Sequence, residues 1–184
     1  MAKLVSKTYG DALFELATEE NKEDVLLEEA EGLKKLISEN DEFLKMMNHP
    51  QITREEKEQI IENIFKGKIS DDMTGFLRLL VMNGRFSELE SVIDYFIAEI
   101  KEYKKIGIAY VVTPLELSDK QKSDIEQKLL DTTKYEKMEM NYDIDESLIG
   151  GMTIRIGDRV IDSSVKSKLN KLTKELKNIR LATS

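Results

Sequence analysis

Residues 145–165 read DESLIGGMTIRIGDRVIDSSV, and this stretch decides the fold of the region around it. Apolar and polar residues alternate over residues 152–156, as in a strand with one buried face. Gly157-Asp158 then separates this run from a second strand-like run at residues 159–161, which predicts a short hairpin. Asp162 and the two serines after it offer side-chain oxygens to a helix N-terminus. The stretch therefore predicts a hairpin that leads directly into a helix.

A pair of glycines, Gly150 and Gly151, stands at the entrance of the first of these strands. Paired glycines permit a positive φ angle or the close approach of another backbone segment. A phosphate-binding loop would need Lys and Ser or Thr after its last glycine, and a dinucleotide loop would need Gly-x-Gly-x-x-Gly opening a helix. Neither order occurs in this stretch. We therefore expect a structural motif, not a nucleotide site, made of Gly150, Gly151, Gly157, Asp158 and Asp162.

The same segment, extended to residue 176, resembles the C-terminal pattern of the delta-subunit family of F-type ATP synthases. The mitochondrial member of that family is the oligomycin-sensitivity-conferring protein. The matching residues run from Asp145 through Ser147-Leu148-Ile149-Gly150-Gly151-Met152 and the Gly157-Asp158 turn to Val160-Ile161-Asp162, Ser164-Val165, Leu169 and Leu172. Residues 9–17 resemble the first helix of the family, although Gly10 stands where alanine is usual. His49-Pro50 and the run from Phe76-Leu77 to Asn83-Gly84-Arg85 extend the resemblance over nearly the whole chain.

Charge is distributed unevenly along the 184 residues. Residues 1–104 hold 14 Lys or Arg against 23 Asp or Glu, a net −9, whereas residues 105–184 hold 14 against 13, a net +1. An acidic surface repels phosphate backbones, so we expect no nucleic-acid partner. The chain has no cysteine, which excludes a disulfide framework and a thiolate metal site within it. No run approaches the roughly 18 to 20 apolar residues of a membrane-spanning helix, so we expect no direct membrane insertion.

Helical periodicity fills residues 1–104 and predicts six helices. They cover residues 3–19, residues 22–38, a short stretch around residues 43–47, a helix opened by a capping box from Thr53 to Glu56, a helix from Ser70 to Asn83-Gly84, and a helix capped at Ser87. Short links between such helices favour antiparallel packing. The first predicted domain is therefore an N-terminal six-helix bundle over residues 1–104.

The pattern changes at about residue 105. A strand over residues 106–113, a helix capped by Ser118 and Gln121, and a strand over residues 138–144 precede the hairpin already described. Beyond the hairpin, one apolar helical stripe is formed by Val165, Leu169, Leu172, Leu176 and Ile179, and the basic residues there are Lys166, Lys168, Lys171, Lys174, Lys177 and Arg180. The basic face is either a solvated surface or an electrostatic guide for an acidic partner helix. The second predicted domain is a small α/β domain over residues 105–184.

No residue set in the sequence suggests an enzyme. His49 is the only histidine, so a histidine-rich metal site or a histidine-containing triad is excluded within this chain. The acidic groups at residues 28–31 and 71–72 are expected to be solvated, because nothing apolar is arranged to separate their pKa values. We therefore predict no catalytic residue, no metal and no cofactor.

The first helix carries more apolar surface than one packed side needs. At about 100° per residue, its apolar positions sweep an arc of about 220°, with Phe14 outside it, whereas one-sided packing needs somewhat over 100°. The surplus is covered either by more of its own domain or by another protein. In the family that the sequence resembles, a groove between the first and fifth helices receives the N-terminal helix of an alpha subunit. Carried over, this implies a groove formed by Tyr9, Ala12, Leu13, Leu16, Leu80, Val81 and Asn83.

The resemblance implies a non-catalytic stator subunit of a rotary F-type ATP synthase. The N-terminal domain is expected to bind alpha subunits of the catalytic head, and the C-terminal domain to bind the b-type peripheral stalk. Such a subunit would couple ion translocation to ATP synthesis from the cytoplasmic face of the cell membrane, attached only through its partners. Without the resemblance, the periodicity predicts only a two-domain interaction protein, and the alternative function is a free-standing regulatory adaptor that binds a helix of another protein.

Overall fold

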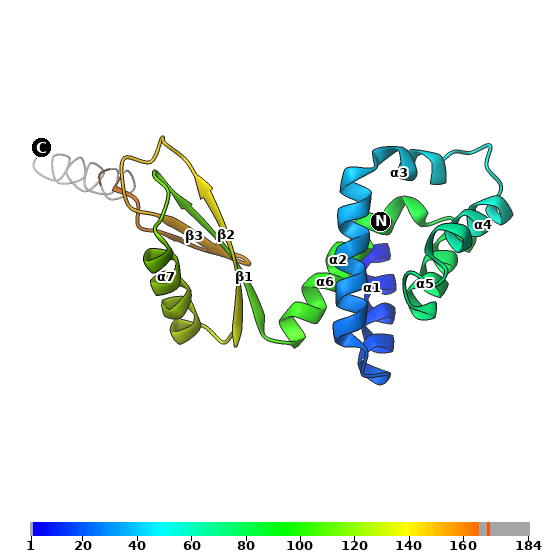
Figure 1. Ribbon diagram of the computed structural model, residues 1–184, viewed down its shortest axis with the longest axis horizontal. Helices are drawn as coiled ribbons and strands as arrows, with labels where there is room; N and C mark the ends of the chain where they lie inside the picture. Colours follow the sequence, from blue (N-terminus) through cyan, green and yellow to red (C-terminus); the bar gives the residue numbers. More distant parts are fainter. Residues whose placement is uncertain (1, 166–168, 170–184) are drawn as a thin grey trace, which may run out of the picture. The chain divides into compact units, whose positions relative to one another are not determined.

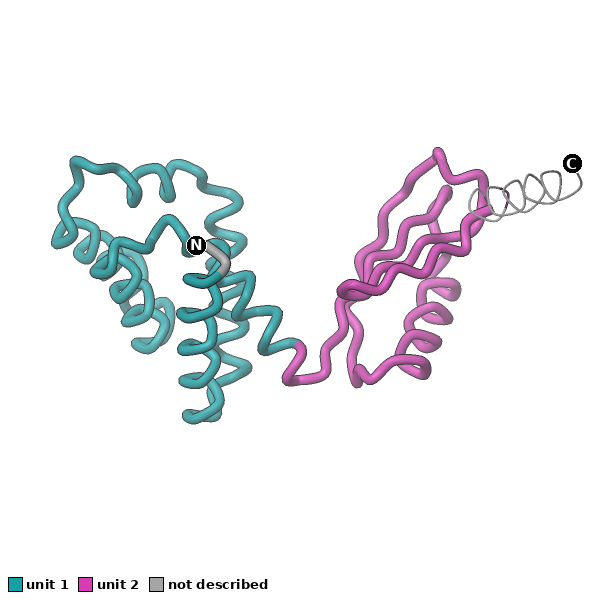
Figure 2. The backbone as a smooth tube through the Cα atoms, turned by 180° about the vertical axis from the view of Figure 1, so that it is seen from behind, with its two compact units in different colours: residues 1–101 teal, residues 102–184 magenta. Residues whose placement is uncertain are grey.

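The computed structural model describes residues 2–165 and residue 169, and the chain divides into two compact units (Figure 2). Unit 1 covers Met1–Lys101 and unit 2 covers Glu102–Ser184. The architecture is α+β, with a helical N-terminal part and a four-stranded sheet in the C-terminal part (Figure 1). Among the described residues, no helix is both long enough and apolar enough to cross a membrane.

Unit 1 is built from helices that share one core. The helices are α1 (Ala2–Glu19), α2 (Glu23–Glu39), α3 (Asp41–Met47), α4 (Arg54–Phe65), α5 (Asp71–Met82) and α6 (Leu89–Tyr103), whose last residues belong to unit 2, with a 3-10 turn, η1 (Phe86–Glu88), before α6. The predicted capping box at Thr53 and Glu56 is confirmed, because Thr53 Oγ1 accepts from Glu56 N and Glu56 Oε2 accepts from Thr53 N. Ser70 caps α5 by accepting from Met73 N at 3.2 Å.

The start of α6 differs from the sequence prediction. Ser87 was expected to cap this helix, but it lies inside the 3-10 turn η1, which runs directly into Leu89. The turn is anchored by Phe86, which is 4% exposed and contacts the ring of Phe43 edge-on at 6.0 Å between centroids. A buried aromatic ring therefore fixes the entry into α6 where the sequence offered a polar cap.

The inner face of α1 combines Leu13 with three small residues. Gly10 and Ser6 are buried together with Leu13 and Ala17, so the packed face lies to one side of the predicted apolar arc. A Cβ on Gly10 would stand 2.3 Å from Cδ1 of Tyr95 on α6, so the missing side chain is what lets the ring lie against α1. Phe14, which the arc left out, also packs against the core.

A polar contact accompanies this close packing of α1 and α6. The Tyr95 hydroxyl donates to Asp11 Oδ1 at 2.9 Å. This hydrogen bond raises the pKa of Tyr95 to about 12, and the loss of hydration around the phenol is the second cause of the shift. The opposite side of α1 is open, because Leu4 is 72% exposed and Ala12 is exposed.

Unit 2 contains a mixed sheet with strand order β2-β1-β3-β4. Its strands are β1 (Ile106–Thr113), β2 (Lys137–Ile144), β3 (Thr153–Ile156) and β4 (Arg159–Asp162), and α7 (Asp119–Thr132) connects β1 to its parallel neighbour β2. Strand β3 is antiparallel to both β1 and β4. The predicted strands, the Ser118–Gln121 capping box and the hairpin are confirmed.

One face of the sheet packs against α7 and forms the core of unit 2 (Figure 1). The buried residues of this core come from alternate positions of the strands and from α7, as the period of two requires. They are Ala109, Val111, Leu129, Met138, Ile154 and Ile156.

The glycine motif joins β3 to the segment that follows β4. Gly151 has φ +82°, and a Cβ on it would lie 2.5 Å from the carbonyl oxygen of Ser163, so both the backbone conformation and the space require glycine. Gly150 accepts a backbone hydrogen bond from Val165 N at 2.9 Å.

The turns of this motif are set by Gly157 and Asp162. Gly157, in the hairpin turn before Asp158, has φ +54°. Asp162 Oδ1 accepts from Ser164 N at 2.9 Å. Leu172, Leu176 and Ile179 of the predicted stripe, and the basic residues from Lys166 to Arg180, lie outside the described residues.

Candidate partner-binding groove

A groove of about 350 Å³ lies between α1 and α5 on unit 1. Its walls come from two helices and are mostly apolar. The lining residues are Ala12, Leu13 and Leu16 of α1 and Asp71, Asp72, Gly75, Phe76 and Leu79 of α5. A hollow of this shape between two helices is suited to an amphipathic helix that lays its apolar stripe along it.

Three of the four α1 residues expected in the groove line it. Leu13 is 1% exposed and forms its floor, whereas Leu16 is half-buried and Ala12 is exposed on its wall. Tyr9 is half-buried and packs on the core of unit 1 without lining the hollow. The apolar surplus of α1 is thus partly covered by its own unit and partly open to a partner.

The expected α5 residues are placed differently from the sequence interpretation. Leu80 and Val81 are 0% and 3% exposed and belong to the core, so they do not line the groove. Asn83 is exposed at the C-cap of α5. It follows Phe76 by seven residues and Leu79 by four, which places it on the same face of the helix, but it is not among the residues that line the hollow.

Leu79 and Gly75 line the groove from α5 and were not expected there from the sequence, and Met82, which does not line it, is a further exposed apolar residue of this helix. Leu79 is 44% exposed and Met82 is 53% exposed, although both are large and apolar. The buried stripe of α5 already accounts for the core contacts, and these two residues fall outside it. The test of arc width that singled out α1 would have found them if it had also been applied to α5.

One end of the groove is acidic, and one of its carboxylates forms an ion pair with a neighbouring lysine. Lys22 Nζ, just beyond α1, pairs with Asp72 Oδ2 at 2.7 Å and also with Glu20. Both hydrogen bonds raise the pKa of Lys22, and the one to Asp72 has the larger effect. Asp71 lies beside this cluster and also lines the groove.

The first turn of α5 is also held by α2. Glu29 Oε1 accepts from Ser70 N at 2.6 Å, and Glu29 Oε2 accepts from Ser70 Oγ at 2.7 Å. Both oxygens of one carboxylate therefore fix the residue that caps α5. The wall of the groove is consequently positioned by contacts with α2 and with its N-cap residue Lys22.

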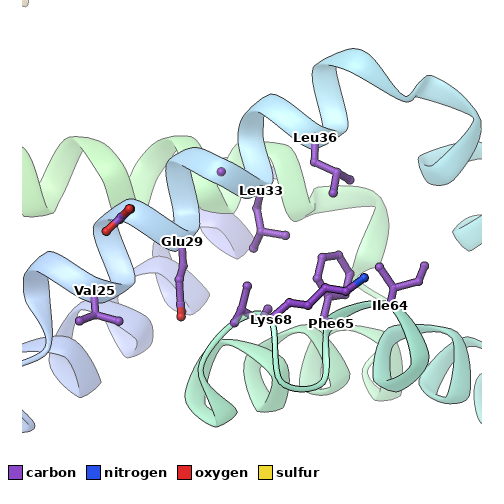
Figure 3. A pocket seen from close by; sticks show the side chains of 10 residues that line it. Val25, Glu29, Leu33, Leu36, Ile64, Phe65 and Lys68 are labelled. Carbon is purple, nitrogen blue, oxygen red and sulfur yellow. The ribbon is translucent and has the colours of Figure 1, made fainter.

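A second hollow of about 460 Å³ lies on the α2 side of unit 1. Leu33 and Leu36 point from α2 toward Ile64 and Phe65 at the end of α4 (Figure 3). Glu29, which also lines it, is bonded to Ser70. The hollow therefore has an apolar interior, and one of its polar groups already serves the fold.

The described residues offer no arrangement for metal chemistry. Among them, no group of three or more His, Cys, Asp or Glu side chains comes together in a way that could hold an ion. His49 is exposed, and its Nδ1 accepts from Gln51 N at 3.3 Å, so the ring helps to shape a turn.

Comparisons with known proteins agree with the resemblance in the sequence. The family model described as ATP synthase delta (OSCP) subunit matches residues 5–176. The chain is 54% identical over 181 residues to the ATP synthase subunit delta of Lachnoclostridium phytofermentans, covering 98% of this chain and 100% of that protein. It is 33% identical to the ATP synthase subunit delta of Acetivibrio thermocellus, with 91% and 94% covered.

A solved structure shares the fold. A chain in the Toxoplasma gondii mitochondrial ATP synthase hexamer superimposes with a TM-score of 0.77 at 21% identity, covering 93% of this chain and 96% of that one. The match of the family model to residues 5–176 and the 54% identity to a curated relative decide the family. The chain belongs to the ATP synthase delta (OSCP) subunit family.

Proposed function

We propose that this chain, a non-catalytic delta subunit of an F-type ATP synthase, links the alpha subunits of the catalytic head to the b-type peripheral stalk. Unit 1, as a six-helix bundle, binds the N-terminal segment of an alpha subunit in the α1/α5 groove. The observation that carries this assignment is the open apolar wall of that groove. Ala12 and Leu79 face it from two helices, and Leu79 is 44% exposed in a chain whose family works inside a complex.

Unit 2 binds the far end of the b-type stalk. What supports this division is that the chain has two compact units with separate cores, so each can carry its own partner. The complex then holds the chain at the cytoplasmic face of the cell membrane through its partners alone.

The mechanism is mechanical. A stator that resists rotor torque must stay bound through many turnovers, which requires slow dissociation. A nanomolar contact corresponds to about −12 kcal/mol. Several buried apolar anchors at roughly 1.5–3 kcal/mol each supply this, after the cost of association is subtracted. No chemical step is required of this chain.

The test is a calorimetric titration of the full-length protein with two probes. One probe is a synthetic peptide of the N-terminal residues of the alpha subunit from the same complex, and the other is the C-terminal part of its b subunit. We expect both to bind, and Leu79→Asp to weaken only the alpha peptide. Val25→Asp is the matched control, because Val25 is a 50% exposed apolar residue on α2 outside the groove. Binding of neither probe to the wild-type protein would overturn the proposal.

A further inference from the structure

The α1/α5 groove contains a glycine that the fold itself does not require. Gly75 lies inside α5 and is exposed. A Cβ built on it meets no atom within 4 Å, and its φ is not positive. Glycine inside a helix lowers stability relative to alanine. Within the described part of the chain, neither backbone conformation nor packing explains why this position lacks a side chain.

The missing side chain leaves room for a partner. Gly75 lines the groove together with Ala12 of α1, so the two smallest side chains of the lining belong to opposite walls. Where a glycine faces outward, the backbone of a bound helix can approach more closely than the usual 8–10 Å between helix axes. The larger residues Leu16, Phe76 and Leu79 then provide apolar contacts around this point.

The acidic end of the groove has one carboxylate that the fold leaves available. Asp72 is engaged by Lys22 at 2.7 Å. Asp71 is exposed and lines the groove, and within the described residues it has no ion-pair or hydrogen-bond partner. A cation on a helix lying in the groove would meet this carboxylate at the edge of an apolar surface, where charge complementarity sets orientation and specificity.

We propose that the α1/α5 groove selects an amphipathic helix that places a small residue over Gly75 and a Lys or Arg against Asp71. This rests on the proposed function and deepens it, because it states which features of an alpha-subunit N-terminal segment are recognised. Gly75 sets how closely the helix approaches, and Asp71 sets how it is oriented along the groove.

The charge part is tested with Asp71→Asn in the full-length protein and the alpha-subunit N-terminal peptide as the probe. We expect the dissociation constant to rise about fivefold at low salt and the difference to shrink at high salt. Asp119→Asn is the matched control, because Asp119 follows the N-cap Ser118 of α7 as Asp71 follows the N-cap Ser70 of α5. The control variant should bind as the wild type does.

Single replacements in the peptide then identify the cation. When each Lys or Arg of the peptide is changed to Gln in turn, one of these changes should cost no further affinity against Asp71→Asn, which marks it as the partner in a double-mutant cycle. Equal dissociation constants for Asp71→Asn and the wild type at low salt would overturn the role of Asp71.

The packing part is tested with Gly75→Ala. Gly32 on α2 is the matched control, because it is also exposed inside a helix and a Cβ on it meets nothing within 4 Å. We expect both variants to raise the midpoint of thermal unfolding, but only Gly75→Ala to weaken binding of the peptide, by about threefold, with Gly75→Leu weakening it further. Unchanged binding by Gly75→Leu would overturn the role of Gly75.

The outcomes separate this inference from the function on which it rests. A peptide that fails to bind the wild-type protein overturns both. A peptide that binds the wild type, loses affinity on Leu79→Asp and ignores both Asp71→Asn and Gly75→Leu leaves the proposed groove in place and overturns only the selection rule.

Discussion

Two glycines inside helices of unit 1, Gly10 on α1 and Gly75 on α5, stand in opposite surroundings. The space beside Gly10 is taken by the ring of Tyr95, which would lie 2.3 Å from an added Cβ, whereas the space beside Gly75 is empty to 4 Å. The first glycine is therefore explained by packing within the protein, and the second is not. Packing within the protein therefore accounts for Gly10, whereas the role proposed for Gly75 depends on its place in the groove, since Gly32 has equally empty surroundings.

Gly151 in unit 2 extends this comparison, because there the space is taken by backbone and not by a ring that can move. An added Cβ would stand 2.5 Å from the Ser163 carbonyl oxygen, and φ is +82°. We expect Gly151→Val to destabilise unit 2 by about 3 kcal/mol, from combined strain and overpacking. Hydrogen exchange resolved by residue should show lost protection in β3 and β4 with α1–α6 unchanged.

The matched variant at this site is Gly150→Val. Gly150 lies one residue away, its φ is not in the positive range, and its Cβ would meet only Val165 Cγ2 at 3.3 Å. Gly150→Val should lower the stability of unit 2 by less than Gly151→Val does. Equal loss of protection in both units would contradict a local role for the pair.

The open groove, to which Gly75 belongs, is tested by Ala12→Asp. Ala12 is exposed in the groove, so an added carboxylate should leave helicity nearly unchanged and raise the dissociation constant of the alpha peptide at least about tenfold, or about 1.4 kcal/mol. Calorimetric titration together with circular dichroism measures both. Ala98→Asp, at an exposed alanine on α6 outside the groove, is the control. An unchanged dissociation constant would remove Ala12 from the interface.

The packed contact between Gly10 and Tyr95 is tested by Gly10→Ala. The added methyl group must displace the Tyr95 ring, so overpacking exceeds the gain in helix propensity, and we expect a net loss of about 1 kcal/mol of unfolding free energy. Gly75→Ala should have the opposite sign, a gain of roughly 0.5–1 kcal/mol. Denaturant titrations of the two variants measure these changes. The comparison fails if both substitutions shift stability in the same direction.

The smallest expected effect concerns pH. The hydrogen bond to Asp11 raises the pKa of Tyr95 to about 12 from its ordinary value of 10.0. The contribution of this hydrogen bond to the free energy of unfolding is therefore complete below pH 10, where Tyr95 keeps its proton in both the folded and the unfolded chain. It is lost as pH rises toward 12, because the unfolded chain ionises first. Tyr95→Phe should flatten the fall in stability over that range, measured by denaturant titration at several pH values, and an unchanged slope would contradict the assignment.

Much of the fold could be predicted from the sequence because it depends on local patterns. The alternation of apolar and polar residues predicted the strands. The side chains of Thr53 and Ser118 cap their helices, as the spacing to Glu56 and Gln121 indicated. The cap at Ser87 was wrong, because a nonlocal contact, the burial of Phe86 against Phe43, replaces it with a 3-10 turn. Such a contact leaves no trace in the spacing of polar residues.

The groove was predictable only in part, for a related reason. Apolar periodicity identifies the residues that face inward but does not tell which of two sides is covered. Leu80 was therefore assigned to the groove although it belongs to the core, and Leu79 was missed although it is open. The surroundings of Gly10 and Gly75 could not be read from the sequence at all, because both are glycines in helices and only three-dimensional neighbours distinguish them.

The carboxylate of Glu29 has a consequence for how unit 1 responds to being pulled. It accepts hydrogen bonds from the backbone N–H and the hydroxyl of Ser70, while Lys22, the N-cap residue of α2, pairs with Asp72 in the first turn of α5. The start of α5 is therefore held by two side chains, one from α2 and one from its N-cap residue, so we expect a force applied to a helix bound beside α5 to be passed on to α2. Removing both acceptor oxygens with Glu29→Ala should leave the equilibrium affinity for the alpha peptide nearly unchanged and shorten the lifetime of the complex under an applied force.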